Sequence, residues 1–356
     1  MRAWAEVRLD RAAKNFREVR RAQRRAKVCC VVKADAYGHG ALALSALYEK
    51  LGADCLAVAT AEEGAALRRG GISLPVLVLG YTPPQEAETL LECGLQQTVF
   101  SLSYAEALSD AAKRAGSLLP VHIKLDTGMG RLGFDCRAGA QPKDALSACS
   151  LPALSPQGVF THFASSGRAA RRQYARFCAG ADFLRANGFE LTRHCANSES
   201  CFDENLQADM VRAGIALYGF GCGSPVMTFK ASIAQVKTVR RGERIGYGGA
   251  YRAPRNMRVA TVCAGYADGL PRAATGFPLA VRGNPAPIVG RVCMDQCMLD
   301  VSGLDCAEGD EVTVFGDAPT AEELARHCHT ISYEILCGVS ARVPRLYLGG
   351  ENSFFD

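Results

Sequence analysis

Lys33 stands at the carboxyl end of an apolar run in the sequence VCCVVKADAYGHG, which covers residues 28–40. The β-branched residues of this run predict a buried strand, so the lysine would lie where the strand leaves the core. A lysine in such a place can be an ion-paired surface residue. It can also be an amine that forms a Schiff base, if burial and nearby cations lower its pKa. The residue and its neighbours leave both interpretations open.

Other polar residues follow further apolar runs in the same manner. They are Lys124, Asp126, Arg131, His162, Asn197, Ser198, Arg212, Gly214 and Tyr218. Ser198 and the backbone amides after Arg212 could bind a phosphate group, because glycine lets the backbone approach an anion closely. A Schiff-base lysine combined with a phosphate site points to pyridoxal phosphate as a cofactor.

The elements that would position these residues alternate between strand and helix through the first two-thirds of the chain. The apolar runs cover residues 28–33, 54–59, 76–80, 97–100, 119–125, 157–163, 192–196 and 208–212. Strands that alternate with helices predict parallel β/α units, and eight units fit a closed barrel of about 200–250 residues. An open doubly wound sheet is the alternative. In a barrel, the carboxyl ends of the strands meet at one rim, so the polar residues would converge there.

The pattern changes near residue 225, where short β-rich runs punctuated by glycine and proline begin. Such runs predict a second, mainly β domain. We therefore expect a barrel over residues 8–224 and a β domain over residues 225–356, with an N-terminal strand at residues 1–7 assigned to the β domain.

The composition is that of a globular enzyme, with 48% hydrophobic and 22% charged residues. The net charge is only +5, and the arginines of residues 17–27 fit the solvated face of an amphipathic helix better than a nucleic-acid site. No apolar run approaches the ~20 residues that a membrane helix needs. The 16 cysteines include no C-x-x-C pair, and the start of the chain does not resemble a signal peptide. We expect a reducing cytoplasm, no metal site, and neither nucleic acid nor membrane as a partner.

Eight motifs in order resemble those of bacterial alanine racemase. They are VVKADAYGHG, KLDTGMGRLG, CANSES, MVRAGIALYG, GYGGAY, GYADG, GRVCMDQ and RVPRLY, and they run from residue 31 to residue 347. The resemblance implies an N-terminal β/α barrel and a C-terminal β domain. It also implies pyridoxal phosphate as cofactor and interconversion of L- and D-alanine for peptidoglycan.

By this resemblance, Lys33 holds the cofactor through a Schiff base and is one of two acid/base groups. The other is Tyr247, which the partner subunit supplies to the opposite side of the substrate Cα. Two bases are needed because racemisation removes a proton from one face of the Cα and returns one to the other. His162 and Arg212 resemble a relay in which the histidine contacts the tyrosine and the arginine contacts the pyridine nitrogen. An obligate homodimer with two composite sites is implied.

The remaining contacts are likewise implied by the resemblance. Tyr37, Ser198, Gly214 and Ile215 match contacts to the cofactor phosphate. Arg131 matches a residue that binds the substrate carboxylate, and Lys124 matches a lysine that the family often carbamylates. Contacts offered by the partner subunit match Met294 and Asp295, and a polar entrance corridor matches Tyr266, Arg272 and Arg291.

The chain departs from some family members at Ala341, where they carry a tyrosine that narrows the pocket. A small residue there leaves room for a larger substrate, and an apolar pocket rejects one added hydroxyl poorly. A serine or serine/alanine racemase is therefore an alternative. A third interpretation, a cofactor carrier without turnover, is disfavoured because such carriers lack a β domain with a residue like Tyr247.

Overall fold

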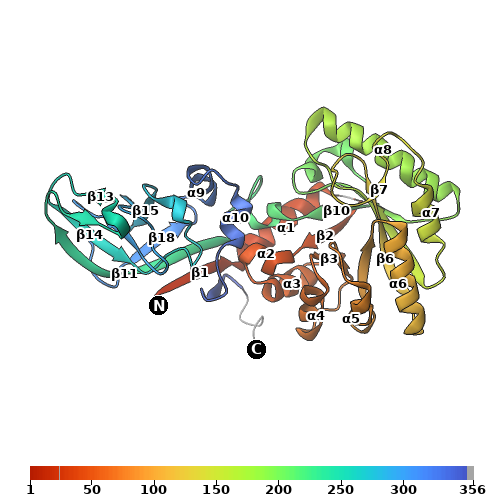
Figure 1. The fold of residues 1–356 in the computed structure, drawn as a ribbon, viewed down its shortest axis with the longest axis horizontal. Coiled ribbons are helices and arrows are strands. Elements are labelled where there is room, and N and C mark those ends of the chain that lie inside the picture. The colour runs from red at the N-terminus through yellow and green to blue at the C-terminus, as the bar shows by residue number, and fades with distance from the viewer. Residues whose placement is uncertain (24, 351–356) are drawn as a thin grey trace. The chain divides into compact units, whose positions relative to one another are not determined.

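The computed structural model describes residues 1–23 and 25–350, which divide into two compact units. The barrel unit comprises Ala13–Ala36 and Ala41–Gly223. The β unit comprises Met1–Ala12, Tyr37–Gly40 and the chain from Ser224 onward. Figure 1 labels the elements of both units.

The barrel unit is built on eight parallel strands that close into a ring. In ring order they are β2 (Lys27–Val31), β3 (Cys55–Val58), β4 (Val76–Val78), β5 (Leu95–Val99), β6 (Leu119–Asp126), β8 (Leu154–Phe160), β9 (Thr192–His194) and β10 (Met210–Ala213). Pairing of β5 with β6 and of β10 with β2 closes the ring. The predicted barrel is therefore confirmed, and the alternative of an open sheet is wrong. A short strand, β7 (Phe134–Asp135), pairs with the end of β6.

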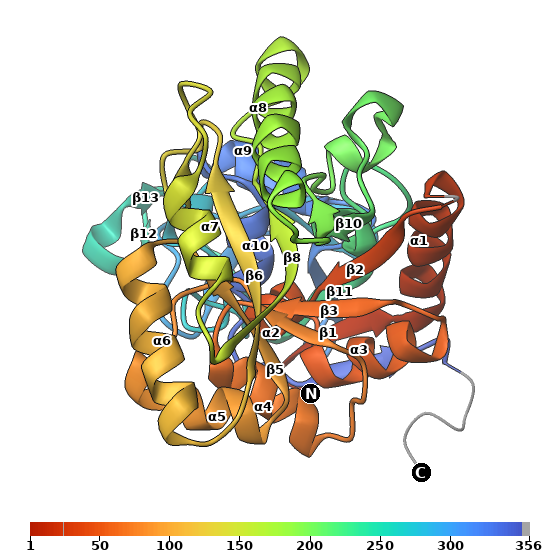
Figure 2. The same cartoon turned by 90° about the vertical axis from the view of Figure 1, so that its right-hand side faces the viewer.

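Helices follow the barrel strands and surround them (Figure 2). They are α1 (Leu9–Ala22), α3 (Ala41–Lys50), α4 (Ala61–Arg69), α5 (Ala87–Glu92), α6 (Leu102–Arg114), α7 (Lys143–Cys149) and α8 (Gly167–Ala186), with short 3-10 turns η1 (Pro84–Glu86), η2 (Ser200–Phe202), η3 (Glu204–Leu206) and η4 (Ile215–Tyr218). The hydroxyls of Thr60 and Ser101 cap α4 and α6 by accepting hydrogen bonds from backbone N–H groups of the first turn. Strands such as β3 and β4 are apolar throughout because both of their faces are buried.

The β unit is a mainly antiparallel sheet, as the sequence pattern beyond residue 225 predicts. Its strands are β1 (Ala3–Arg8), β11 (Met227–Val239), β14 (Met257–Val262), β15 (Pro278–Val281), β16 (Asn284–Pro287), β17 (Cys297–Asp300), β18 (Glu311–Phe315) and β19 (Arg345–Leu348), with a separate pair β12 (Arg244–Ile245) and β13 (Tyr251–Arg252). The smaller elements are α9 (Ala321–His327), α10 (Ser332–Cys337), η5 (Tyr247–Gly249) and η6 (Arg272–Ala274). The N-terminal strand β1 pairs with both β11 and β19, so the first residues of the chain belong to this sheet.

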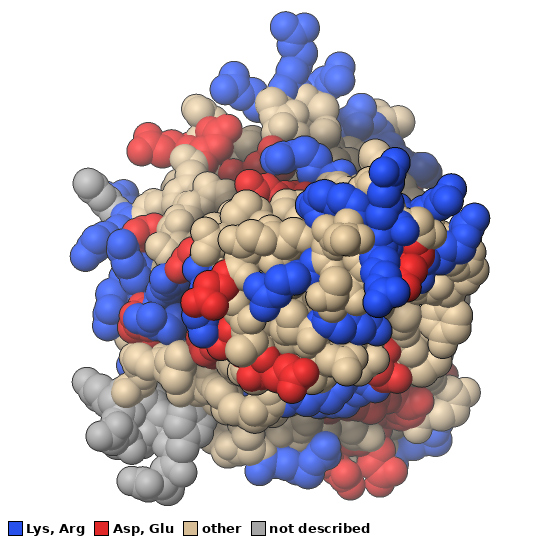
Figure 3. Space-filling view, turned by 90° about the vertical axis from the view of Figure 1, so that its left-hand side faces the viewer, with Lys and Arg blue, Asp and Glu red and all other residues tan. Residues whose placement is uncertain are grey.

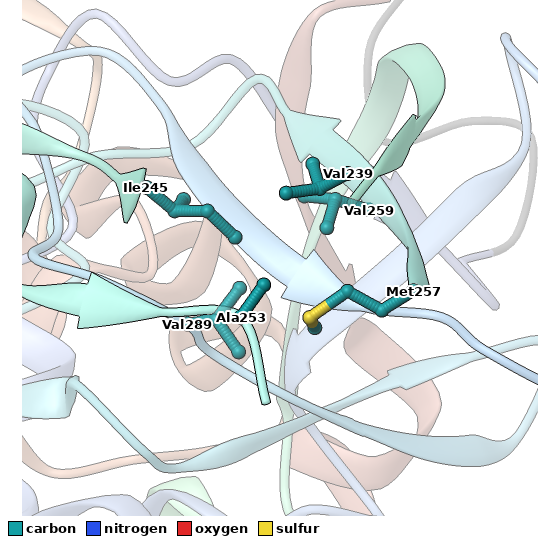
Figure 4. Packing of buried hydrophobic residues seen from close by; sticks show 6 residues of the cluster. All are labelled: Val239, Ile245, Ala253, Met257, Val259 and Val289. Carbon is teal, nitrogen blue, oxygen red and sulfur yellow. The ribbon is translucent and has the colours of Figure 1, made fainter. Parts of the chain in front are cut away.

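A compact apolar cluster supports the end of the β unit that carries Tyr247 (Figure 4). Its buried members are Val239, Ile245, Ala253, Met257, Val259 and Val289. Tyr251 and Met298 pack against them. The cluster ties β11, β12 and β14 together, so the loop that follows β12 starts from a fixed point.

The surface is mixed in charge. Figure 3 shows one face on which basic side chains outnumber acidic ones and both kinds are interspersed. No helix within residues 1–23 or 25–350 combines the length and the apolar character that a membrane span requires.

Candidate active site

Lys33 begins a turn of left-handed helix, α2 (Lys33–Gly38), directly after β2. The φ angles of Ala34, Asp35, Ala36 and Tyr37 lie between 51° and 54°. A run of non-glycine residues in this region is costly, at roughly 1–2 kcal/mol per residue. Conformations of this kind persist where the surroundings enforce them, and they cluster at functional sites. The left-handed turn is therefore the first structural sign that Lys33 has a special position.

Two carboxylates tie this turn to the neighbouring helices. Glu63 of α4 accepts hydrogen bonds from Ala34 N–H and Ala59 N–H, both at 2.7 Å. Asp35 accepts one from Ala41 N–H at 2.7 Å, which links the turn to the start of α3. Each is a charge-assisted bond, so the backbone beside Lys33 is fixed from both sides.

Cationic groups gather around Lys33 at the carboxyl ends of the strands. Burial, followed by Arg131 and Arg212, lowers the pKa of Lys124 to about 8, and Lys33 contributes in the same direction. Asp126 acts in the opposite direction on this amine. A mutually repelling set of this kind fits an anion, because a negative charge would relieve each member.

His162 belongs to the same set. Burial, then Arg212, Arg131, Lys124 and Lys33, lower its pKa to about 3. The imidazole is therefore neutral at physiological pH. Its Nδ1 lies 3.4 Å from Nη2 of Arg212. Because a guanidinium can only donate, Nδ1 is the acceptor in this contact and Nε2 carries the proton.

Arg212 is a buried cation that donates to three backbone carbonyls. It donates to Thr161 O at 2.8 Å, to His194 O at 3.0 Å and to Cys195 O at 3.3 Å. Burial lowers its pKa, but an arginine remains protonated in proteins. Its guanidinium also lies 5.1 Å from the ring centroid of Phe160. These contacts fix the guanidinium in one place, from which it can donate and never accept.

A pair of buried histidines extends this arrangement into the barrel. Nη1 of Arg212 lies 2.9 Å from Nδ1 of His194, and Nε2 of His194 lies 2.8 Å from Nδ1 of His122. Because Arg212 donates, His194 must accept at Nδ1 and donate from Nε2, and His122 must accept at Nδ1. Burial, followed by Arg212, lowers the pKa of both rings, that of His122 to about 4. Both imidazoles are therefore neutral, and each has a single tautomer.

Backbone donors meet a hydroxyl at the ends of β9 and β10. Ser198 Oγ accepts from Gly214 N–H at 2.8 Å and from Ala216 N–H at 3.3 Å, on either side of Ile215. Asn197 Oδ1 accepts from Glu199 N–H and Ser200 N–H, both at 3.1 Å, which turns the chain sharply at Ser198. The group can present several N–H and O–H donors to one anion.

Three of the predicted residues of the β unit line a cavity of about 1100 Å³. Tyr247 on η5, Met294 and Asp295 line it, and the Tyr247 side chain is 71% exposed. Arg291 lies beside the tyrosine loop, because a Cβ on Gly248 would be 3.5 Å from its Nη1. Tyr266 is held next to Met294 through its N–H, which donates to Cys293 O at 3.0 Å. Arg272 lies in η6 and is not among the described residues that line this cavity.

Tyr37 and Tyr218, which were also singled out from the sequence, are both buried and make contacts within their own units. Tyr37 is buried against Tyr333 in the β unit, with ring centroids 5.8 Å apart, and burial raises its pKa. Tyr218 is buried in the barrel unit and donates its hydroxyl proton to Val31 O at 2.8 Å. The hydroxyl of Tyr218 therefore has a structural contact within the barrel.

Two family models match the chain in sequence. One, described as the N-terminal domain of alanine racemase, matches residues 7–221, and one described as its C-terminal domain matches residues 226–347. The chain belongs to the alanine racemase family. The predicted family, and with it an enzyme, is confirmed.

Relatives and solved structures agree with this assignment along the whole chain. The alanine racemase of Desulfovibrio desulfuricans is 42% identical over 97% of this chain and 98% of its own. The alanine racemase structure from Clostridium difficile 630 superposes with a TM-score of 0.93 at 35% identity, covering 100% of this chain and 99% of that one. The structure from Bacillus anthracis, described as having bound L-Ala-P, superposes with a TM-score of 0.91 at 33% identity, covering 98% of this chain and 96% of that one.

Sequence reasoning missed several groups that support the site in this racemase-family chain. The histidine pair carries a signal in its spacing, because His122 lies two residues before Lys124 and the two share the inner face of β6. Gln173 of α8 gave no such signal. It accepts from Ala164 N–H at 2.9 Å and donates to His162 O at 3.3 Å and to Thr127 Oγ1 at 3.4 Å. It thereby ties together the loops that follow β6 and β8.

Proposed function

We propose that this chain interconverts L- and D-alanine with pyridoxal phosphate held on Lys33. The observation that carries the proposal is the cationic group around Lys33, formed with Lys124, Arg131 and Arg212, which together keep the neighbouring His162 neutral. The relative from Desulfovibrio desulfuricans is an alanine racemase, and the similar Bacillus anthracis structure has L-Ala-P bound.

The chemistry of the donors fits the cofactor. Its phosphate suits the group at Ser198, where the N–H groups of Gly214 and Ala216 both point at the serine hydroxyl. Its ring nitrogen suits Arg212, a donor that is fixed by carbonyls. Its anionic groups suit the cations around Lys33. When bound, the cofactor supplies a conjugated ring that takes up the electrons left on the substrate Cα.

The two proton-transfer groups are the Lys33 amine and the Tyr247 phenol. We assign one to each side of the substrate Cα, so that neither must move around it during a turnover. A tyrosine has an ordinary pKa of ~10 and needs help to act as a base near neutral pH. His162 can give that help. Its neutral ring carries the proton on Nε2, and donation from there to the phenolate oxygen would favour the ionised tyrosine.

Lys124 is proposed to be carbamylated. Its pKa, lowered to about 8, gives the amine a much larger neutral fraction near neutral pH than an ordinary lysine has, and the neutral form is the one that reacts with carbon dioxide. The product is an anion in the middle of a cationic group, next to Arg131, whose guanidinium it would hold toward a substrate carboxylate. The mass of the intact protein, recorded with and without bicarbonate, tests this assignment.

Tyr247, Met294 and Asp295 are proposed to serve the site of a second copy, as a homodimer with composite sites requires. Tyr247 and Met294 are large apolar side chains that are 71% and 53% exposed. Exposed apolar groups around a large cavity are typical of a surface that another protein covers. Size-exclusion chromatography with light scattering tests the dimer, and an active monomer would refute it.

A chiral assay tests the function. Purified protein with pyridoxal phosphate is given L-alanine or L-serine, and the D-isomers are followed with time. We expect D-alanine to form faster. Faster D-serine would favour the alternative, because the small, exposed Ala341 leaves room for the larger side chain. Lys33→Ala should abolish racemisation and the visible absorbance of the bound cofactor. Lys113→Ala, at an exposed position on α6, is the matched control and should change neither.

If neither D-isomer forms in the wild type, racemisation of these two amino acids is refuted. A wild type that binds the cofactor through Lys33 but turns over neither amino acid would favour the carrier interpretation. The product of the proposed reaction, D-alanine, is a component of peptidoglycan, and supplying it is the biological role that we propose.

A further inference from the structure

A fully buried carboxylate in the β unit joins two arginines that are far apart in the sequence. Asp268 has no exposed surface, and its two oxygens accept from Nη1 and Nη2 of Arg2 at 2.6 and 2.8 Å. Nε of Arg342 donates to the same carboxylate at 2.7 Å, and Gly265 N–H donates at 2.9 Å. Burial alone would raise the pKa of Asp268, but the hydrogen bonds from Arg2 and Arg342 outweigh it and lower the pKa. The carboxylate is therefore a charged, fully bonded centre.

Both arginines continue from this centre to Asp295. Nη2 of Arg2 donates to the backbone oxygen of Asp295 at 2.7 Å. Nη2 of Arg342 donates to the side-chain Oδ1 of Asp295 at 2.8 Å. Arg2 therefore binds the main chain of Asp295, and Arg342 binds its side chain. Because each guanidinium forms several bonds in a fixed plane, the pair fixes the direction as well as the place of this residue.

Asp295 lies in a tight turn that has little freedom of its own. Cys293 N–H donates to Gln296 O at 2.9 Å and closes the turn. Ala267 N–H donates to Met294 O at 3.0 Å, and a Cβ on Gly265 would lie 2.3 Å from that same oxygen. The turn therefore rests directly on the loop that carries Asp268. A small displacement of the arginines would be transmitted to Met294.

The backbone at Arg2 is fixed by the sheet, although Arg2 itself precedes the first strand. Its carbonyl accepts from Ser232 N–H at 3.0 Å, and the next residue, Ala3, pairs with Ala231 in the sheet. The Arg2 side chain is 43% exposed, so it contributes little to the apolar core. Its bonds to Asp268 and Asp295 are its main contribution.

We propose that Arg2 and Arg342, through the buried Asp268, are positioning residues for the turn that bears Met294 and Asp295. The inference rests on the proposed function, in which this turn contacts the substrate. It makes the residue that precedes β1 part of the apparatus for binding substrate. Loss of Arg2 removes the donor to Asp295 O and two bonds to Asp268, but leaves the fold of the sheet intact.

The test compares Arg2→Ala, Arg2→Lys and Arg8→Ala in the full-length protein with its cofactor. Arg8 is the matched control, because it ends the strand that Arg2 directly precedes, its side chain is 41% exposed and it pairs with an aspartate, Asp10, at 2.8 Å. Arg2→Ala should raise the KM for L-alanine about tenfold with a smaller change in kcat, since displacing a binding group by ~1 Å can cost up to ~100-fold. Arg2→Lys should recover part of the loss, and Arg8→Ala should match the wild type.

Hydrogen exchange of the Met294 and Asp295 amides provides a readout apart from activity. We expect faster exchange in Arg2→Ala and wild-type exchange in Arg8→Ala. The inference would be overturned if Arg2→Ala raised the KM without faster exchange, or exchanged faster without a higher KM. It would also be overturned if Arg2→Ala and Arg8→Ala had equal effects. A wild type that does not racemise would refute the proposed function alone, because the exchange comparison still reports whether Arg2 holds the turn.

Discussion

The left-handed turn after Lys33 predicts that one added glycine will stabilise the protein. Ala34, Asp35, Ala36 and Tyr37 have φ angles of 51–54°. At roughly 1–2 kcal/mol for each residue, the turn costs on the order of 4–8 kcal/mol. This cost is comparable to the net stability of a typical domain, about 5–15 kcal/mol. Contacts such as the bond from Ala34 N–H to Glu63 at 2.7 Å must therefore offset it.

Ala34 is the suitable position because its side chain is exposed. Ala34→Gly removes the conformational cost of one residue and keeps the N–H that donates to Glu63. Glycine also gives the unfolded chain more conformational freedom, which lowers the stability of the folded protein by about 0.4–1 kcal/mol. The difference predicts a net stabilisation of about 0.5–1 kcal/mol. Ala36 is unsuitable because its methyl group is fully buried, and losing it would cost about 0.8 kcal/mol more.

Ala66→Gly is the matched control, since Ala66 is an exposed alanine within the right-handed helix α4. It should destabilise by about 1 kcal/mol, because glycine is a poor residue in a helix interior. Urea unfolding followed by circular dichroism would compare the two variants. We expect the midpoint to rise for Ala34→Gly and to fall for Ala66→Gly. A fall of similar size for both would show that Ala34 is not in a left-handed conformation, and the reasoning about the turn would be refuted.

Three further predictions concern the interior of the barrel. The pKa of His122 is lowered to about 4 in the fold, so unfolding takes up a proton there and His122 alone should cost on the order of 3 kcal/mol of stability as the pH falls from 6.5 to 4. His122→Gln keeps an acceptor but cannot titrate, so it should remove this share of the measured dependence and leave the shares of His162 and His194, whose pKa values are also lowered. Gly158→Ala should destabilise by about 1–3 kcal/mol, because its Cβ would lie 2.4 Å from Nδ1 of His122, and adding His122→Ala should reduce that penalty in urea unfolding. Gln173→Leu should cost about 2–3 kcal/mol and lower kcat/KM, because it leaves buried polar groups around His162 unpaired; unchanged kcat/KM would exclude a role in placing that loop.

The closed barrel could be predicted because its signals are local. Each strand is a short apolar run between helical patterns, and the count of such runs matches a barrel. Positions for Lys33, Lys124, His162 and Arg212 followed from the same signals, since each comes at or just beyond the end of a run. The motif resemblance then named the second group, around Tyr247, which no local pattern would have singled out.

What could not be predicted depends on pairs of residues that are distant in the sequence. Arg2 and Asp268 are separated by 266 positions, and Arg2 looks like an ordinary charged residue near a chain end. The left-handed turn was also hidden, because the segment Ala34–Tyr37 contains no glycine and alanine favours a right-handed helix. Only the contacts with Glu63 and the start of α3 explain why the chain takes the costly conformation.

The polar interior of the barrel has a chemical consequence that a hydrophobic core would not provide. Arg212 needs fixed acceptors, and the carbonyls of Thr161, His194 and Cys195 supply them without adding negative charge. A carboxylate in place of His194 would neutralise the guanidinium and weaken it as a donor toward a ligand. A neutral imidazole, held in one tautomer by His122, accepts the bond and leaves the full positive charge in place. The buried histidine pair therefore keeps Arg212 both immobile and cationic, which are the two properties its proposed role requires.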